Sequence, residues 1–203
     1  MPKVSDEHQE SRKKQILEAA TTCFGRSGLY GATMDDICRE AGLSKGAVYG
    51  YYKSKDDIVS ALKVESVQRD ASIVRSATQN HDPDSSLAAM LAEAFGTLAE
   101  RAPEKRTDVM MWAEALLSQR LLDAQLLETQ LWTDAIEILV QEAQRRGFIN
   151  HELDAKSISW MLTAMIYGAT AMKSWDPSFD PSQAAEIARA LVTGRFAPTQ
   201  SHN

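Results

Sequence analysis

The segment from Thr33 to Lys55 constrains the fold of this chain most strongly (TMDDICREAGLSKGAVYGYYKSK). Thr33 precedes a short stretch whose apolar side chains recur at helical spacing and which stops at Gly42, and Ser44 precedes a second stretch that continues to Tyr51. Serine and threonine are preferred at helix N-caps, and glycine is preferred just past helix ends. Two short helices joined by a tight turn predict a helix-turn-helix.

The rest of the chain also follows the helical period, and the alternation of apolar and polar residues that marks strands is nearly absent. We therefore expect an all-α fold of about nine helices. The expected helices cover residues 10–27, 34–41, 45–51, 55 to about 78, 84–101, 103–118, 121–146, 155–173 and 182–195. Gly28 and Gly147 are the expected stops of the first and seventh of these helices.

The composition excludes several classes of protein. No stretch approaches the roughly 18 apolar residues of a membrane span, so we expect no membrane partner and a cytoplasmic location. The two cysteines, Cys23 and Cys38, lie on apolar helix stripes and are expected to be buried and reduced. The four histidines show no metal-ligand spacing, and no glycine-rich phosphate loop is present, so we expect no metal and no cofactor.

Charge is distributed unevenly along the chain. The formal net charge is −6, which by itself disfavours a nucleic-acid partner. Residues 12–55, however, carry eight basic and four acidic side chains, whereas residues 56–203 carry 13 basic and 21 acidic ones. The asymmetry predicts an anionic partner for the N-terminal segment alone.

The predicted second helix of the helix-turn-helix has the residues that a DNA-reading helix needs. A helix approaches base edges in the major groove closely when its leading side chains are small, as Gly46 and Ala47 are. Tyr49 and Tyr51, together with Lys45 and Lys55, are placed to donate hydrogen bonds to phosphates on either side of the groove.

With these residues the sequence resembles the tetracycline-repressor (TetR) family of bacterial regulators. The resemblance covers residues 12 to about 60, with nearly every motif position filled in order. It rests on Ile16-Leu-Glu-Ala-Ala, Phe24, Gly28, Thr33-Met, Ile37, Ala41-Gly-Leu-Ser-Lys-Gly-Ala-Val-Tyr49 and Tyr51-Tyr-Lys-Ser-Lys55.

The resemblance implies a DNA-binding domain at residues 10–55 and a ligand-binding and dimerisation domain at residues 56–203. It places Lys45, Gly46 and Ala47 at base edges. It places Tyr49, Tyr51 and Lys55 on the phosphate backbone and lets the cap residues Thr33 and Ser44 touch phosphate. The implied DNA-binding set is Thr33, Ser44, Lys45, Gly46, Ala47, Tyr49, Tyr51 and Lys55.

The acidic C-terminal part offers only general patterns. The last two predicted helices are rich in alanine and glycine, which suits close helix packing, and we expect them to form a four-helix dimer interface. Methionines and tryptophans on the preceding helices suit an adaptable apolar pocket. The expected ligand-binding residues are Met111, Trp112, Glu114, Trp132, Met161 and Met165. An inward-facing Glu114 beside Trp112 would favour a lipophilic cation.

The resulting hypothesis is a homodimeric, ligand-responsive transcriptional repressor that binds a palindromic double-stranded DNA operator and leaves it when a small lipophilic effector binds. Two alternatives stay open. The first is an all-α enzyme that uses the acidic half, although no residue spacing specifies a catalytic group. The second is a helical protein-interaction module.

Overall fold

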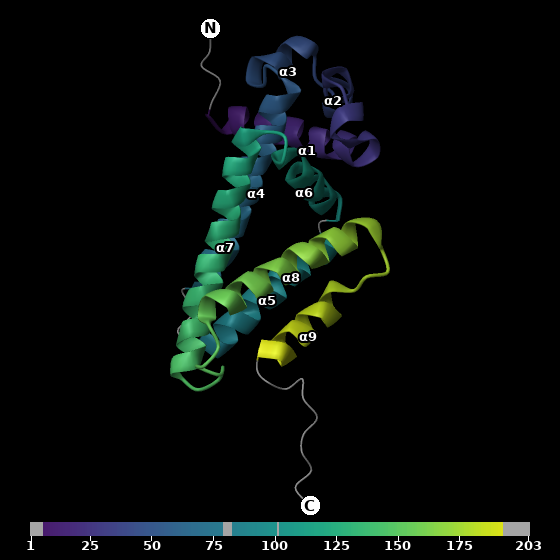
Figure 1. The fold of residues 1–203 in the computed structure, drawn as a ribbon. Coiled ribbons are helices and arrows are strands. Elements are labelled where there is room, and N and C mark those ends of the chain that lie inside the picture. Colours follow the sequence, from purple (N-terminus) through teal and green to yellow (C-terminus); the bar gives the residue numbers. More distant parts are fainter. Residues whose placement is uncertain (1–5, 79–82, 101, 193–203) are drawn as a thin grey trace, which may run out of the picture. The chain divides into compact units, whose positions relative to one another are not determined.

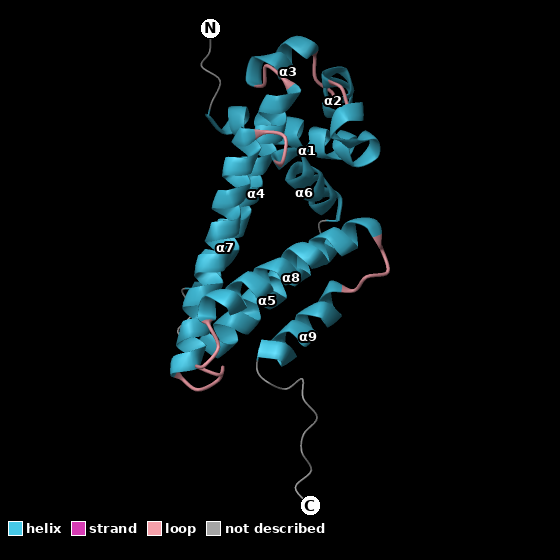
Figure 2. Ribbon diagram, viewed as in Figure 1, coloured by secondary structure: helices cyan, strands magenta, loops and turns pink. Residues whose placement is uncertain are grey.

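The computed structural model describes residues 6–78, 83–100 and 102–192, and within these ranges the chain forms nine α-helices and no strand. Figure 2 shows short loops joining the helices. The prediction of an all-α fold is confirmed.

The observed helices follow the sequence expectation closely, with α2, α3, α4 and α8 beginning at the expected residues (Figure 1). The helices are α1 Asp6–Gly31, α2 Met34–Ala41, α3 Lys45–Tyr51, α4 Lys55–Thr78, α5 Pro83–Glu100, α6 Ala102–Ala115, α7 Gln119–Arg145, α8 Ala155–Trp175 and α9 Pro181–Val192. Helix α6 ends three residues before the expected Ser118, because Leu116 and Leu117 turn back with i→i+3 hydrogen bonds to Ala113 and Glu114. The expected ends of the fifth and ninth helices, at residues 101 and 195, lie outside the described residues.

Two glycines set the helix boundaries at the N-terminal end of the chain. Gly28 interrupts α1 with φ 73° and ψ 169°, so the last turn of α1 is kinked away from the rest. Gly42 closes α2 at φ 65°, and its N–H and that of Leu43 donate to the last carbonyls of the helix. Left-handed backbone of this kind favours glycine, which has no Cβ to clash with the carbonyl oxygen.

The described structure divides into two compact units. Unit 1 comprises Met1–Ser66 and Pro103–Ala124, and unit 2 comprises Val67–Ala102 and Gln125–Asn203. The domain boundary expected after residue 55 lies inside unit 1, near the start of α4, and as a division of function it stays a prediction.

Unit 1 has its own apolar core, formed mainly by α1, α2 and the first half of α4. Ile16, Phe24 and Ile37 are fully buried in it, and both cysteines lie there with at most 6% of their surface exposed. Burial is the largest cause that raises the pKa of both thiols, and it outweighs the nearby basic side chains.

Unit 2 is a layered helix bundle in which α5 packs against α8 and α9, as Figure 1 shows. Its core includes Phe95, Ile136 and Leu162, each at most 1% exposed. This unit also contains a buried polar contact, in which the indole Nε1 of Trp132 donates to Asp70 Oδ2 at 2.6 Å, with both side chains buried.

Candidate functional site

The helix-turn-helix begins with a reciprocal cap at Thr33. Its hydroxyl accepts a hydrogen bond from the Asp36 N–H at 3.2 Å, and the Asp36 carboxylate accepts one from the Thr33 N–H at 3.0 Å. The Thr33 hydroxyl also donates to the Asp36 carboxylate at 2.6 Å, and this bond together with that from the Thr33 N–H holds the pKa of Asp36 below its ordinary value. The capping box fixes where α2 starts, because two otherwise unpaired backbone donors are satisfied.

The first turn of α3 is exposed and nearly free of side-chain bulk. Ser44 caps it, with the hydroxyl accepting from the Ala47 N–H at 3.2 Å. Lys45 and Gly46 are exposed, Ala47 is half-buried, and no atom lies within 4 Å of where a Cβ on Gly46 would stand. A surface of this shape allows a close approach to another backbone or to the edge of a base.

Two of the expected DNA contacts, Lys45 and Tyr49, are exposed near α3. The Lys45 ammonium donates to Asp35 Oδ2 at 2.6 Å, and this hydrogen bond raises the pKa of Lys45. Tyr49 is 39% exposed, and its carbonyl accepts from the Lys53 ammonium at 2.7 Å. Lys53 is exposed and was not among the expected contacts, although its basic side chain directly after α3 could have indicated it.

Two of the expected phosphate contacts, Tyr51 and Lys55, are engaged within unit 1. Tyr51 is half-buried against the apolar core. The Lys55 ammonium donates to the carbonyls of Leu29 at 2.6 Å and Ala32 at 3.2 Å, so it satisfies carbonyls near the end of α1. A role of Tyr51 and Lys55 at DNA stays a prediction, and their contacts in the structure stabilise unit 1.

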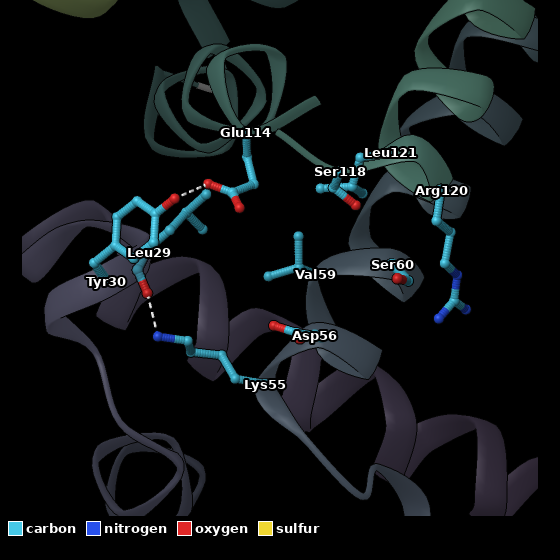
Figure 3. Close-up of a pocket in the computed structure, with 10 residues that line it drawn as sticks. All are labelled: Leu29, Tyr30, Lys55, Asp56, Val59, Ser60, Glu114, Ser118, Arg120 and Leu121. Atoms are coloured by element: carbon cyan, nitrogen blue, oxygen red, sulfur yellow. Dashed lines mark hydrogen bonds between the residues drawn. The ribbon is translucent and has the colours of Figure 1, made fainter. Parts of the chain in front are cut away.

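A cavity of about 280 Å³ lies within unit 1 (Figure 3). It opens between the last turn of α1, the first turns of α4 and the turn that joins α6 to α7. The lining residues are Leu29, Tyr30, Lys55, Asp56, Val59, Ser60, Glu114, Ser118, Arg120 and Leu121.

A hydrogen bond joins two of the helices that form this cavity. The Tyr30 hydroxyl donates to Glu114 Oε2, which connects the last turn of α1 to the end of α6 (Figure 3). The bond to this carboxylate raises the pKa of Tyr30. The glycine kink in α1 is what gives this last turn its own direction.

The six expected ligand-binding residues are divided between the two units. In unit 1, Met111 is 2% exposed within the core, Trp112 is half-buried, and only Glu114 lines the cavity. The Glu114 carboxylate accepts the Tyr30 hydrogen bond, and a preference for a lipophilic cation at Glu114 and Trp112 stays a prediction.

In unit 2, the other three expected residues differ in exposure. Trp132 is buried with Asp70 as its partner, Met165 is half-buried against the core, and Met161 is 49% exposed. Beside them the Tyr167 hydroxyl lies 2.9 Å from Thr129 Oγ1, and burial raises the pKa of this tyrosine.

Two further properties concern the whole described chain. Among the residues that the structure covers, no group of three or more His, Cys, Asp or Glu is arranged to hold a metal ion. No helix in the same residues combines the length and the apolar character needed to cross a membrane.

Comparison with protein families gives matches over both parts of the chain. Residues 16–62 match the model described as bacterial regulatory proteins, tetR family. Residues 83–197, more than half of the chain, match the model described as BetI-type transcriptional repressor, C-terminal.

Individual relatives agree with these matches. An HTH-type transcriptional repressor of Mycobacterium tuberculosis is 37% identical over 73 residues, 36% of this chain and only 39% of that relative's length. The transcriptional regulator UidR of Escherichia coli is 23% identical over 198 residues, 96% of this chain and 97% of UidR. The structure of Bacillus subtilis FadR in complex with stearoyl-CoA superposes with a TM-score of 0.75 at 19% identity, covering 91% of this chain and 99% of that chain.

Proposed function

This chain belongs to the TetR family of bacterial regulatory proteins, and we propose that it is a homodimeric repressor that leaves a palindromic operator when a small lipophilic effector binds. It is a ligand-responsive transcriptional regulator, and its family consists of regulators and not of enzymes. We further infer that it acts in the cytoplasm, where regulators of a bacterial DNA-binding family meet their operators.

The exposed first turn of α3 is the observation that carries the DNA-binding proposal. Ser44 fixes the start of this helix, Gly46 leaves open space, and Lys45 extends from the same turn. We assign Lys45, Gly46 and Ala47 to base edges and Tyr49 to a phosphate, with the exposed Lys53 as an added phosphate contact.

Titration of the full chain against DNA from upstream of its own gene tests this assignment. Tyr49→Phe removes one phosphate donor and should weaken binding to specific and unrelated DNA by the same factor, whereas Lys45→Ala should change the preference among operator variants. Lys156→Ala, an exposed lysine on α8, is the matched control. Unchanged affinity and preference in both α3 variants, or no salt-sensitive binding by the parent protein at its own or neighbouring promoters, would refute the proposal.

The dimer proposal rests on an exposed apolar face of unit 2. Along α8 the exposed positions recur every three to four residues, so they share one side of the helix. Helix α9, which packs against α8, adds two exposed aliphatic side chains. The face comprises Trp160, Ala164, Gly168, Met172 and Trp175 of α8 with Ile187 and Leu191 of α9. A contiguous exposed apolar face marks an interaction site, and we assign this one to an interface between two copies of the chain.

Gly168→Arg tests the face without disturbing the protomer. A Cβ at Gly168 meets nothing within 4 Å, and arginine is the better helix former, so the single chain tolerates the change. In a helix–helix interface the arginine would block close approach, and light scattering should report a monomer. Gln130→Arg, an exposed change on α7, should leave a dimer. A dimeric Gly168→Arg protein would exclude this face.

We assign the effector site to unit 2, around Trp132, Met161 and Met165. Support comes from the adaptable thioether of the half-buried Met165 beside the core, and from the shared fold of a regulator that binds stearoyl-CoA. Met165→Ala should reduce the release of DNA by an active apolar compound while leaving DNA affinity in its absence unchanged. Equal sensitivity to the compound in Met165→Ala and parent protein would move the site elsewhere.

A further inference from the structure

The cavity of unit 1 is lined by residues other than those assigned to the effector site of unit 2. We propose that it is a second binding site, for a small carboxylate that carries an apolar body. The inference does not depend on the identity of the effector or of the operator, because the cavity is built entirely from residues of unit 1.

The floor of the cavity is apolar. Leu29, Val59 and Leu121 line it, each with 6–8% of its surface exposed, and all three belong to the unit 1 core. The volume of about 280 Å³ is ample for one ring, since a cavity of roughly 150 Å³ accommodates benzene. An apolar floor under a polar rim is the usual construction of a small-molecule site.

Three hydrogen-bond donors face one side of this cavity. Figure 3 shows Arg120 and Ser60 on the same side, with Ser118 above them. Ser60 is only 9% exposed, and its hydroxyl has no hydrogen-bond partner among the described residues. Arg120, likewise without a partner in that part of the chain, has a planar guanidinium that matches a carboxylate in geometry.

The start of α7 adds to the positive potential on that side. Ser118 and the first-turn residues Arg120 and Leu121 line the cavity, so the N-terminus of this 27-residue helix opens onto it. Backbone N–H groups and the helix dipole favour an anion at such an end. The guanidinium, the Ser60 hydroxyl and the helix N-terminus therefore all suit an anionic ligand.

The acidic groups of the rim are consistent with this choice. Glu114 lies on the opposite side of the cavity and accepts the Tyr30 hydrogen bond, so its charge is already partly compensated (Figure 3). Asp56 is the remaining acid, and it should weaken carboxylate binding by like-charge repulsion. Removing the charge of Asp56 should therefore strengthen the binding of a carboxylate.

A ligand in this position would contact three helices of unit 1, the unit that contains the helix-turn-helix. Leu29 belongs to the last turn of α1, Val59 to the first turns of α4, and Leu121 to α7. Filling the cavity would hold these segments together, so the ligand would act directly on the DNA-reading unit and without passing through the effector site.

Amide NMR spectra of the full-length ¹⁵N-labelled chain test the site with three probes of one shape. Benzoate is the anion, benzamide its neutral counterpart and benzylamine the cation. We expect saturable shifts at the amides of Val59, Ser60, Arg120 and Leu121 with benzoate, and none with the other two probes. Saturable shifts with benzylamine alone would overturn the assigned charge, and no saturable shift with benzoate would overturn the site.

Three variants separate recognition from nonspecific attraction. Arg120→Gln should weaken benzoate binding at least tenfold, and Asp56→Asn should strengthen it several-fold. Arg106→Gln, on an exposed arginine of α6 outside the cavity, should leave it unchanged. An undisturbed amide spectrum without probe verifies that each variant is folded. Equal weakening of benzoate binding by Arg120→Gln and Arg106→Gln would mean that benzoate responds only to the overall charge of the protein, and this would refute the site.

Discussion

The kink at Gly28 gives a stability difference that can be worked out from two glycines of the same helix. Gly25 and Gly28 both lie in α1, and a Cβ added to either meets no atom within 4 Å. Replacement by alanine therefore changes the backbone preference alone. The two positions differ in that Gly28 has φ 73° and ψ 169°, whereas Gly25 lies in the regular helix.

The two substitutions should change the free energy of unfolding in opposite directions. Alanine at Gly25 should stabilise the protein by about 1 kcal/mol, the difference in helix propensity between the two residues. Alanine at Gly28 must occupy a region that is nearly reserved for glycine, at a cost on the order of 1–3 kcal/mol. The two variants should therefore differ by roughly 2–4 kcal/mol in free energy of unfolding.

Thermal unfolding followed by circular dichroism at 222 nm measures this difference. For a chain of this length each kcal/mol corresponds to about 2–4 °C, so the Tm values should separate by roughly 4–16 °C, with Gly25→Ala the higher. Equal Tm values, or a Gly28→Ala protein as stable as the parent, would refute the inference that left-handed backbone at this position ends the long part of α1.

Three further predictions concern other parts of the chain. Trp132→Phe keeps an aromatic side chain but removes part of the buried ring volume and the donor to buried Asp70, and should lower the free energy of unfolding by at least about 1.5–3 kcal/mol in urea titrations. Asp154, whose pKa is lowered by its cap hydrogen bonds to the start of α8, stabilises the fold above its unfolded pKa of about 3.9 and loses this effect as pH falls through its folded value. Asp154→Asn keeps a cap and should show a smaller fall in Tm between pH 6 and pH 3. Cys23 and Cys38 should react with a thiol reagent at pH 8 much more slowly in the folded than in the urea-unfolded chain, because burial raises both thiol pKa values.

The helix boundaries were predictable because local chemistry decides them. Thr33, Ser44 and Asp154 are N-caps whose side chains accept from residues three positions later, and Gly42 supplies the left-handed C-cap. Each device acts within a few residues, so the sequence specifies it without knowledge of the tertiary structure. The early end of α6 was missed because no glycine or proline marks it.

The surroundings of the candidate site were less predictable, because they depend on residues far apart in the chain. Lys55 resembles a phosphate contact in the sequence, yet its ammonium donates to carbonyls 23 and 26 residues away. Glu114 meets Tyr30 across 84 residues. Helical periodicity identifies the face of a helix that is apolar but does not say which other helix covers it, so the cavity of unit 1 had no signal in the sequence.

The ion pair between Lys45 and Asp35 has a consequence for how the protein competes for DNA. In the free protein the ammonium is already satisfied at 2.6 Å, so a base contact by Lys45, as proposed, is an exchange of partners and not the capture of a free charge. Added salt weakens the ammonium's attraction both to Asp35 and to DNA. Lys45 should therefore contribute less than a full phosphate contact to the salt dependence of operator binding, and more to the choice between operators.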